Sequence, residues 1–445
     1  MISRILPWQR MGFWLRRTLR KVWVRVVGFA ILAVASAVLA RLLSPFVPAE
    51  LAPRLGADAV GQILVTLASS MLAVTTFSLS IAVSAFAAAA STATPRATAL
   101  LQEDHTTQNV LATFLGAFLF SLLGLIGLRA NVYDDSGTVI LFLFTVLVVA
   151  LVIVALIHWI GHLMSFGRMH DTLDRVEAAA RDAFERRVER PYLGANPMPQ
   201  TLPQRLTAIA SQHTGYVQYL DVQALEECAA ELDARIYVAA LPGSFVHLAA
   251  PLVRVTANDL DPESEERIRS TFSIGRDRTF EEDPRFGLIV LSEIASRALS
   301  PAVNDPGTAI SVIGRLVAIL SRWQPAEDPE VLYPHVFVEP ITPEDVLEDA
   351  FRPIARDGAG LIEVQLRLQA AFRALRDTAN SNLADAVVTA SRAALDRARA
   401  AGLRPAELAT LEEAAIGKSA IGESAIVDTA TSAAAGSDGH GEAER

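Results

Sequence analysis

The sequence predicts a membrane α-helical protein with four transmembrane helices, followed by a cytoplasmic mixed α/β domain rich in helices. The first observation is composition: 51% of the 445 residues are hydrophobic, and they concentrate between Val22 and Phe166. The second is length, because four apolar runs in this part reach about 20 residues, enough for a helix to cross a bilayer. The third is the dominance of charged residues after Phe166, which is typical of a soluble domain.

The distribution of arginine predicts how the chain crosses the membrane. Residues 1–21 are strongly basic, and further arginines follow the last apolar run at Arg168, Arg175, Arg181, Arg186 and Arg187. Cytoplasmic flanks of membrane spans are enriched in Lys and Arg, so both termini are expected in the cytoplasm. The expected spans are 22–43, 59–94, 106–128 and 137–166. The expected division is a basic N-terminus at 1–21, a transmembrane domain at 22–166, a linker at 167–200, an α/β domain at 201–410 and a disordered tail at 411–445.

The second span is unusually long. No charged residue interrupts the chain from Ala59 to Pro95. As one helix this stretch would measure about 55 Å, whereas the hydrocarbon core of a bilayer is about 30 Å thick. The helix is therefore expected to tilt, or to project beyond the bilayer on the cytoplasmic side.

Small and hydroxyl-bearing residues of this span share one helix face, which we call the hydroxyl stripe. At 100° per residue they fall within an arc of about 80°. The members are Gln62, Thr66, Ser69, Ala73, Thr76, Ser80, Ser84, Ala87, Ser91 and Thr94. Apart from Gln62, no residue larger than threonine stands in it, so this face is small and polar along its whole length.

Two interpretations of the stripe remain open from the sequence. In one, small residues let another helix approach closely, and each hydroxyl bonds across the interface or to its own helix. In the other, copies of the helix surround a wetted pathway. The candidate pathway-lining residues are Gln62, Thr66, Ser69, Thr76, Ser80, Ser84 and Ser91.

His158 and His162 are the candidates for a metal site near the end of the fourth span. Four residues apart, they share one helix face, as metal-binding histidine pairs do. The residue after the first histidine is Trp159, so the glutamate of a zinc protease is missing. Interfacial residues at the end of a span explain the pattern more simply. The sequence therefore assigns no metal and no cofactor.

The soluble part alternates short strands and helices before it becomes helical. Strands are expected at 207–211, 216–220, 236–240, 244–247, 252–256 and 336–341. Helices are expected at 222–233, 263–272, 284–299, 306–323, 343–355, 360–380 and 383–401. Asp221 and Asp305 precede two of these helices and are expected to cap them, with Pro306 in the first turn of the second.

A polar cluster is expected around the helix at 284–299. RDRTFEEDPRFG precedes this helix and SPAVNDPGTA follows it. The arginines can order this corner by pairing with its carboxylates, or they can present cations to an anionic ligand. The cluster candidates are Arg276, Arg278, Asp283, Asn304 and Asp305.

Composition excludes several classes of function. Cys228 is the only cysteine, so the chain can form neither an internal disulfide nor a cysteine-based metal cluster. A formal net charge of −10 argues against a nucleic-acid partner, for which a basic patch is expected. No nucleophile with an adjacent base and no glycine-rich phosphate loop is recognisable, so an enzyme is not expected. The expected partners are the lipid bilayer and further copies of the chain, and any ligand is unknown.

Several segments resemble a known family. GYVQYLD, PGSFV, FSIGRDRTFEEDPRFG and RALSPAVNDPGTA are similar to segments of a bacterial family of predicted membrane proteins, the domain of unknown function 2254. The resemblance covers about residues 10 to 400. It implies a bacterial inner-membrane location but brings no activity, ligand or catalytic residue. The chain departs from the pattern at Ala249 and Ala250, where a second glycine is expected after PGSFV.

The function predicted from these features is that of an oligomeric inner-membrane protein. Its second spans would line or flank a channel-like pathway for ions or small solutes, and the cytoplasmic domain would control that pathway. The alternative is a membrane-anchored sensor or scaffold without transport activity, in which the hydroxyl stripe is a packed helix interface.

Overall fold

The computed structural model describes residues 22–43, 57–102, 104–164, 168–257, 259–326, 328–378 and 381–416. The chain divides into two compact units, Met1–Thr172 and Leu173–Arg445. The basic N-terminus at 1–21 lies outside the described residues, as does the tail after residue 416.

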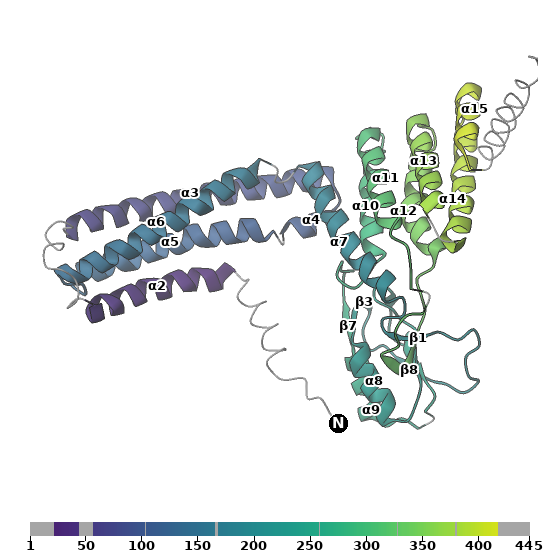
Figure 1. Cartoon of the computed structure of the whole chain (residues 1–445), viewed down its shortest axis with the longest axis horizontal. Coiled ribbons are helices and arrows are strands. Elements are labelled where there is room, and N and C mark those ends of the chain that lie inside the picture. Colours follow the sequence, from purple (N-terminus) through teal and green to yellow (C-terminus); the bar gives the residue numbers. More distant parts are fainter. Residues whose placement is uncertain are drawn as a thin grey trace, which may run out of the picture. The chain divides into compact units, whose positions relative to one another are not determined.

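The first unit consists of long apolar helices that run alongside one another (Figure 1). They are α2 (Val22–Leu43), α3 (Ala57–Thr92), α5 (His105–Arg129) and α6 (Asp135–Leu163), with the short α4 (Pro95–Gln102) after α3. All four long helices are long and apolar enough to cross a membrane. The four predicted spans are therefore confirmed as membrane-length helices, and α3 is a single 36-residue helix.

Helix α5 lies at the centre of this unit and packs against α2, α3 and α6. Its side chains Phe114, Ala117 and Phe120 are fully buried, and Leu64 of α3 and Leu141 of α6 join them in one apolar core. Within the described residues, α3 makes its extensive helix contacts with α5 alone and meets α6 over a smaller area. One side of α3 is therefore left without a partner in the part of the chain that the structure describes.

The second unit contains two small sheets. The five-stranded sheet has the order β1-β8-β4-β6-β2, and the three-stranded sheet has the order β5-β3-β7. Strand β8 pairs in parallel with β1 and β4, whereas β6 pairs antiparallel with β4 and β2. The strands are β1 (Ala195–Pro197), β2 (Thr207–Ala210), β3 (Gly215–Leu220), β4 (Ile236–Val238), β5 (Phe245–Val246), β6 (Pro251–Val255), β7 (Phe272–Gly275) and β8 (Tyr333–Val338).

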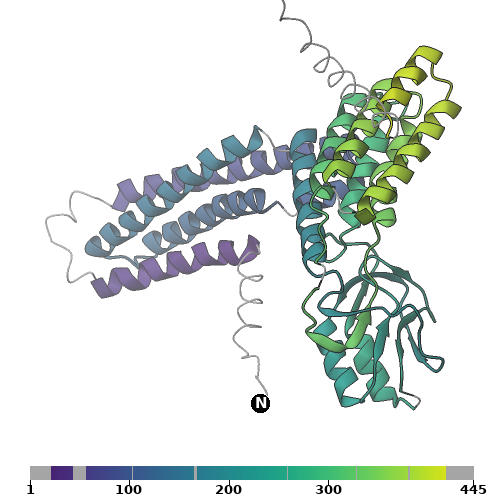
Figure 2. The ribbon, with the colours of Figure 1, turned by 45° about the vertical axis from the view of Figure 1, so that its right-hand side comes forward.

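Nine helices of the second unit lie within the described residues. Figure 2 shows α10–α15 gathered at one end of this unit, with the strands, α8 and α9 at the other. The helices are α7 (Met169–Glu189), α8 (Val222–Glu231), α9 (Pro262–Ser270), α10 (Phe286–Ala298), α11 (Pro306–Leu320), α12 (Pro343–Asp357), α13 (Ile362–Thr378), α14 (Ser381–Ala400) and α15 (Pro405–Ala414). The mixed α/β class rich in helices is thus confirmed for this unit, and Asp221 caps α8 as expected, 3.0 Å from Ala224 N.

The expected linker at 167–200 is not a linker. It contains α7 and β1, and the second unit begins at Leu173. Helix α7 carries many charges, but Leu173, Val176, Ala180 and Phe184 are buried at helical spacing. Such an amphipathic face packs onto a core, which is why this segment belongs to the folded unit.

Two other boundaries differ from expectation. The helix expected to reach residue 272 ends at Ser270, because Phe272 opens strand β7, which pairs with β3. The disordered tail expected from residue 411 is wrong for residues 411–414, since α15 continues to Ala414 and its Leu411 is fully buried. A buried leucine on the last helix indicates packing rather than a solvated tail.

Candidate functional site

The hydroxyl stripe lies on the outer face of α3. Every stripe member whose side chain the structure describes within α3 is exposed: Gln62, Thr66, Ser69, Ala73, Thr76, Ser80, Ser84 and Ala87. The opposite face is buried and consists of Val60, Leu64, Leu67, Met71, Ser78 and Ala82. The two sets are centred about 180° apart on the helix. The stripe therefore points away from α5 and has no partner within the described part of the chain.

Ser91 and Thr94 differ from the other predicted stripe residues. Ser91 belongs to α3, but its side chain falls outside what the structure describes. Thr94 follows the end of α3 and is buried, and its Oγ1 accepts from Ala97 N at 3.3 Å. Thr94 therefore caps α4 instead of extending the stripe, because the helix stops before Pro95.

Stripe hydroxyls are satisfied by their own helix. Thr66 donates to Gln62 O at 2.8 Å, Thr76 to Leu72 O at 3.0 Å and Ser80 to Thr76 O at 3.1 Å. This back-bonding is common for Ser and Thr in helices. A hydroxyl bonded in this way tolerates an apolar neighbour as well as water, so the hydrogen bonds alone do not choose between the two interpretations of the stripe.

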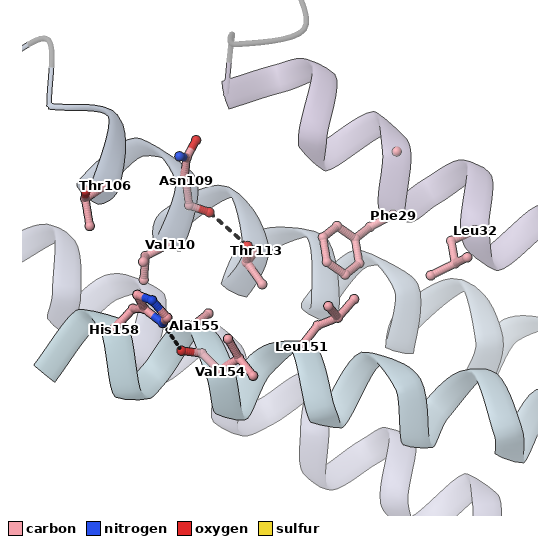
Figure 3. Close-up of a pocket in the computed structure, with 11 residues that line it drawn as sticks. Phe29, Leu32, Thr106, Asn109, Val110, Thr113, Leu151, Val154, Ala155 and His158 are labelled. Atoms are coloured by element: carbon pink, nitrogen blue, oxygen red, sulfur yellow. Dashed lines mark hydrogen bonds between the residues drawn. The ribbon is translucent and has the colours of Figure 1, made fainter. Parts of the chain in front are cut away.

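A mostly apolar crevice of about 570 Å³ opens between α2, α5 and α6. Figure 3 shows Asn109 and His158 at one end of it and Phe29 and Leu32 at the other. Thr113 donates to the backbone O of Asn109 at 2.9 Å, and His158 Nδ1 lies 3.0 Å from Val154 O. A crevice with apolar walls and a polar end fits an acyl chain better than a hydrated ion.

The two candidate metal-binding histidines point to different partners. His162 Nε2 lies 2.9 Å from Asp104 Oδ2, and Asp104 also caps α5 by accepting from Thr107 N at 2.6 Å. His158 bonds to its own helix and lines the crevice. The described residues contain no group of three His, Cys, Asp or Glu side chains that could hold a metal ion. The visible role of His162 is to join the end of α6 to the start of α5.

Asp283 organises one half of the expected polar cluster. Its Oδ2 accepts from Arg278 Nε at 2.6 Å, and its Oδ1 accepts from Arg285 N and Phe286 N, both at 3.1 Å. The carboxylate thus satisfies the first free N–H groups of α10. The Arg278 guanidinium carbon also lies 5.4 Å from the centre of the Phe286 ring.

Gly243 of the PGSFV segment packs against the same carboxylate. Its φ is +93°, and a Cβ at this position would lie 2.4 Å from Asp283 Oδ2. Both the backbone conformation and the space therefore require glycine. This contact brings together two of the segments that carried the family resemblance.

Asn304 and Asp305 form a separate corner beyond the other end of α10. Asp305 caps α11, and Asn304 has a left-handed backbone with a φ of +50°. The 13 residues of α10 lie between this corner and Asp283, a length of about 20 Å. The expected single cluster is therefore divided into two local caps, and Arg276 is exposed.

Arg187 is a residue whose importance the sequence did not reveal. In the sequence Arg187 counted only as one of the positive charges after the last span. In the structure it is buried, with 6% of its surface exposed. A signal was present: Arg187 continues the buried series of α7, three residues after Phe184. A charged residue on the apolar face of an amphipathic helix is a candidate for a specific role.

The chain is similar to proteins of one family. Residues 19–374 match a protein family described as predicted membrane protein (DUF2254). Two uncharacterized proteins, Mb1321c of Mycobacterium bovis and Rv1290c of Mycobacterium tuberculosis, are each 30% identical to the chain over 280 residues. That alignment covers 59% of this chain, which spans 50% of the length of each relative. No solved structure matches the chain.

Proposed function

Since the chain belongs to this family of predicted membrane proteins, we propose that it assembles in the bacterial inner membrane into a homo-oligomer around a channel-like pathway. In this proposal copies of α3 present their hydroxyl stripes to one another and line a path for ions or small solutes. The second unit lies in the cytoplasm and controls the path. No catalytic reaction is assigned to the chain.

The observation that supports this proposal most is the direction of the stripe. It faces away from α5, while Leu72, Phe77, Leu79 and Val83 are exposed beside it. Large apolar side chains suit lipid, whereas a strip of small and polar residues suits either the backbone of a second helix or water. A second copy of the chain would supply the second helix, and several copies around one axis would enclose the water.

The alternative function, a membrane-anchored sensor or scaffold, has an observation of its own in its favour. The hydroxyls of Thr66, Thr76 and Ser80 bond to carbonyl oxygens of α3. They therefore need no water, and two copies of α3 can meet in a dry interface. Both functions require self-association and differ in whether the stripe is wet.

Cysteine accessibility separates these two functions. Single Ser69→Cys, Ser80→Cys and Ser84→Cys variants are made in a Cys228→Ala background and treated with a small water-soluble thiol reagent in membranes. A wetted pathway makes all three react, because the reactive thiolate forms readily only where water reaches the sulfur. Ala82→Cys on the buried face and Val83→Cys beside the stripe are the controls, and both are expected to stay protected.

Oxidative crosslinking of the same variants tests the assembly itself. Cysteines on the stripe of neighbouring copies are expected to form disulfide-linked dimers, whereas the cysteine at position 82 is not. If the stripe cysteines crosslink but do not react with the thiol reagent, the interface is dry; this result supports the scaffold function and excludes the pathway. If no stripe position crosslinks, both functions are excluded, because each requires contact between copies of α3.

The proposed topology places both termini in the cytoplasm. The turn after Arg129 is then periplasmic, and the Asp104–His162 contact lies on the cytoplasmic side. A reporter enzyme that is active only in the periplasm, fused after Glu189 at the end of α7, is expected to be inactive. Full reporter activity there would reverse the orientation.

A further inference from the structure

A second cavity, of about 660 Å³, lies within the second unit. It is lined by α7 and the residues just after it, the chain after α11, the connection from β8 to α12 and the start of α14. Its lining includes Phe184, Arg187, Tyr192, Trp323, Glu344 and Asp385. This volume is in the range of small-molecule sites in proteins.

Arg187 brings a buried positive charge to this cavity. Its Nη2 donates to Glu339 O at 3.1 Å, but its Nε, also buried, has no acceptor among the described residues. Among the residues that the structure describes, it forms no ion pair. Burial lowers the pKa of Arg187 to about 10, against the opposing effect of the Glu282 and Asp283 charges. The guanidinium therefore remains cationic at neutral pH with its hydrogen-bonding capacity only partly used.

Trp323 brings a second unused donor from a different element. It is 7% exposed, and its ring packs against Phe184 with 5.6 Å between the ring centres. The indole Nε1–H is buried and has no acceptor in the described part of the chain. A buried donor without an acceptor is costly, and the two side chains that carry these donors, Arg187 and Trp323, both line the cavity.

The remaining walls indicate what kind of molecule fits. Phe184, Tyr192 and Trp323 supply aromatic surface, and Pro325 and Pro340 add apolar contacts. Glu344 and Asp385 are exposed, so their carboxylates belong to the solvent side of the lining. The buried side has two donors, one of which is the Arg187 cation, while the solvent side is negative. An anionic group is therefore favoured only at the buried side, with an apolar body along the aromatic rings.

We propose that this cavity binds a small organic anion, a carboxylate or phosphate on an apolar or aromatic body, with Arg187 and Trp323 donating to its oxygens. Arginine suits this role because its planar fork of donors matches carboxylate and phosphate oxygens. Trp323 adds a neutral donor and stacking surface at the same site. This ligand site does not depend on the transport proposal, since it lies wholly within the second unit.

The direct test is binding of defined probes to the full-length protein in detergent, measured by calorimetry. The probes are benzoate and phenyl phosphate as aromatic anions, inorganic phosphate as an anion without an apolar body, and benzyl alcohol as the neutral match. At least one aromatic anion is expected to bind, and to raise the unfolding temperature by mass action. Benzyl alcohol and inorganic phosphate are expected to bind at least about tenfold more weakly, since each loses a charge-assisted hydrogen bond or the apolar contact.

Two substitutions connect the binding to the two donors. Arg187→Met removes the cation, and Trp323→Phe keeps a ring against Phe184 but removes the Nε1–H. Each is expected to weaken binding of the aromatic anion by about tenfold or more. Arg322→Met is the matched control, because it removes a half-exposed cation next to Trp323 that does not line the cavity. The control is expected to change the affinity by less than about fivefold.

Each outcome decides the proposal. Selective binding of an aromatic anion that both donor substitutions weaken and the control does not supports it. Equal affinity for benzyl alcohol, unchanged affinity in Trp323→Phe, or no binding of either aromatic anion overturns it. If Arg187→Met fails to fold, Trp323→Phe decides alone, because it preserves the aromatic packing. None of these results bears on crosslinking through α3, so failure here is distinguishable from failure of the proposed function.

Discussion

Helices α3 and α7 both have a polar outer face, but only α7 also buries a charged side chain, Arg187. On α3 the polar face is outermost, and Thr66, Thr76 and Ser80 bond to their own helix. On α7 the outer face is charged as usual, but Arg187 lies on the buried face, and its Nε has no acceptor in the described part of the chain. The exposed hydroxyls of α3 thus already have acceptors, whereas the buried Arg187 of α7 still lacks an acceptor for its Nε–H among the described residues.

This difference shows which polar residues indicate a ligand. A hydroxyl is short and can reach the carbonyl oxygen one turn back, so its exposure to lipid or to a second helix is inexpensive. A guanidinium has five N–H donors spread over a rigid plane, and its own helix cannot satisfy them. Satisfied hydroxyls in a membrane helix therefore do not by themselves indicate a ligand, whereas a partly satisfied buried arginine that lines a cavity is a better candidate for ligand binding.

The largest expected effect comes from the contact that holds α7 in the second unit. A Cβ on Gly287 would lie 2.3 Å from Ala180 Cβ and 2.5 Å from Ala180 Cα. Gly287→Ala is therefore expected to push α7 from α10 and to destabilise the protein by about 1–3 kcal/mol. Thermal unfolding measures the loss.

Gly314→Ala is the opposite control, because nothing lies within 4 Å of a Cβ there. Alanine in a helix interior is more favourable than glycine by up to about 1 kcal/mol, so this variant is expected to gain stability. If both variants change the unfolding temperature equally, α7 does not pack closely on α10. Arg187 would then not lie on a buried face, and the contrast between α3 and α7 would not hold.

The next effect compares two serines of α3 that lie two residues apart. Ser78 is 1% exposed on the inner face, and Ser80 is exposed on the stripe. Ser78→Leu is expected to overpack the bundle and cost about 1–3 kcal/mol. Ser80→Leu is expected to leave unfolding of the protomer unchanged and to alter assembly or solute flux, because small residues set the approach of a second helix.

Thermal unfolding and crosslinking of both serine variants measure these effects separately. Loss of protomer stability in Ser80→Leu equal to that in Ser78→Leu would place the stripe inside the bundle. Unchanged assembly and unchanged flux in Ser80→Leu would leave the stripe without a function.

Much of the fold could be predicted from the sequence because its signals are local. Four long apolar runs gave four membrane-length helices, and Asp221 and Asp305 capped the helices they precede. The register of the strands depends on contacts between distant segments, as for β1 with β8. Such pairings leave no mark in a short window of sequence, and so β1 and β7 went unpredicted.

The candidate sites were predictable to a smaller extent. The one-sided hydroxyl stripe follows from helical periodicity, but whether it faces α5 or the outside depends on which face packs. The prediction of a single cluster with Asp283 and Asp305 was wrong, because α10 lies between these two residues and separates them. The cavity at Arg187 and Trp323 joins residues 136 positions apart in the chain, and only the folded structure brings them together.

The smallest expected effect concerns a polar residue that, like the stripe hydroxyls, is exposed and satisfied by neighbours in sequence. Asp305 accepts from Thr308 N at 3.0 Å and from Thr308 Oγ1 at 2.6 Å. Loss of this cap in Asp305→Ala is expected to cost about 1 kcal/mol. Asp305→Asn keeps a good cap without the charge and is expected to stay close to wild type at neutral pH.

The pH dependence of the same cap provides the last test. The bonds from the Thr308 side chain and backbone lower the pKa of Asp305 below its ordinary value of 3.8. A carboxyl with a lowered folded pKa binds its proton more readily when unfolded, so its stabilising effect is full above pH 3.8 and is lost as the pH falls through the folded pKa. The difference in unfolding free energy between wild type and Asp305→Asn is therefore expected to change in favour of the variant between pH 5 and pH 2. If this difference stays constant over the pH range, the carboxylate charge adds nothing to the cap. The cap of α11 would then be stabilised only by uncharged hydrogen bonding, as the α3 hydroxyls are.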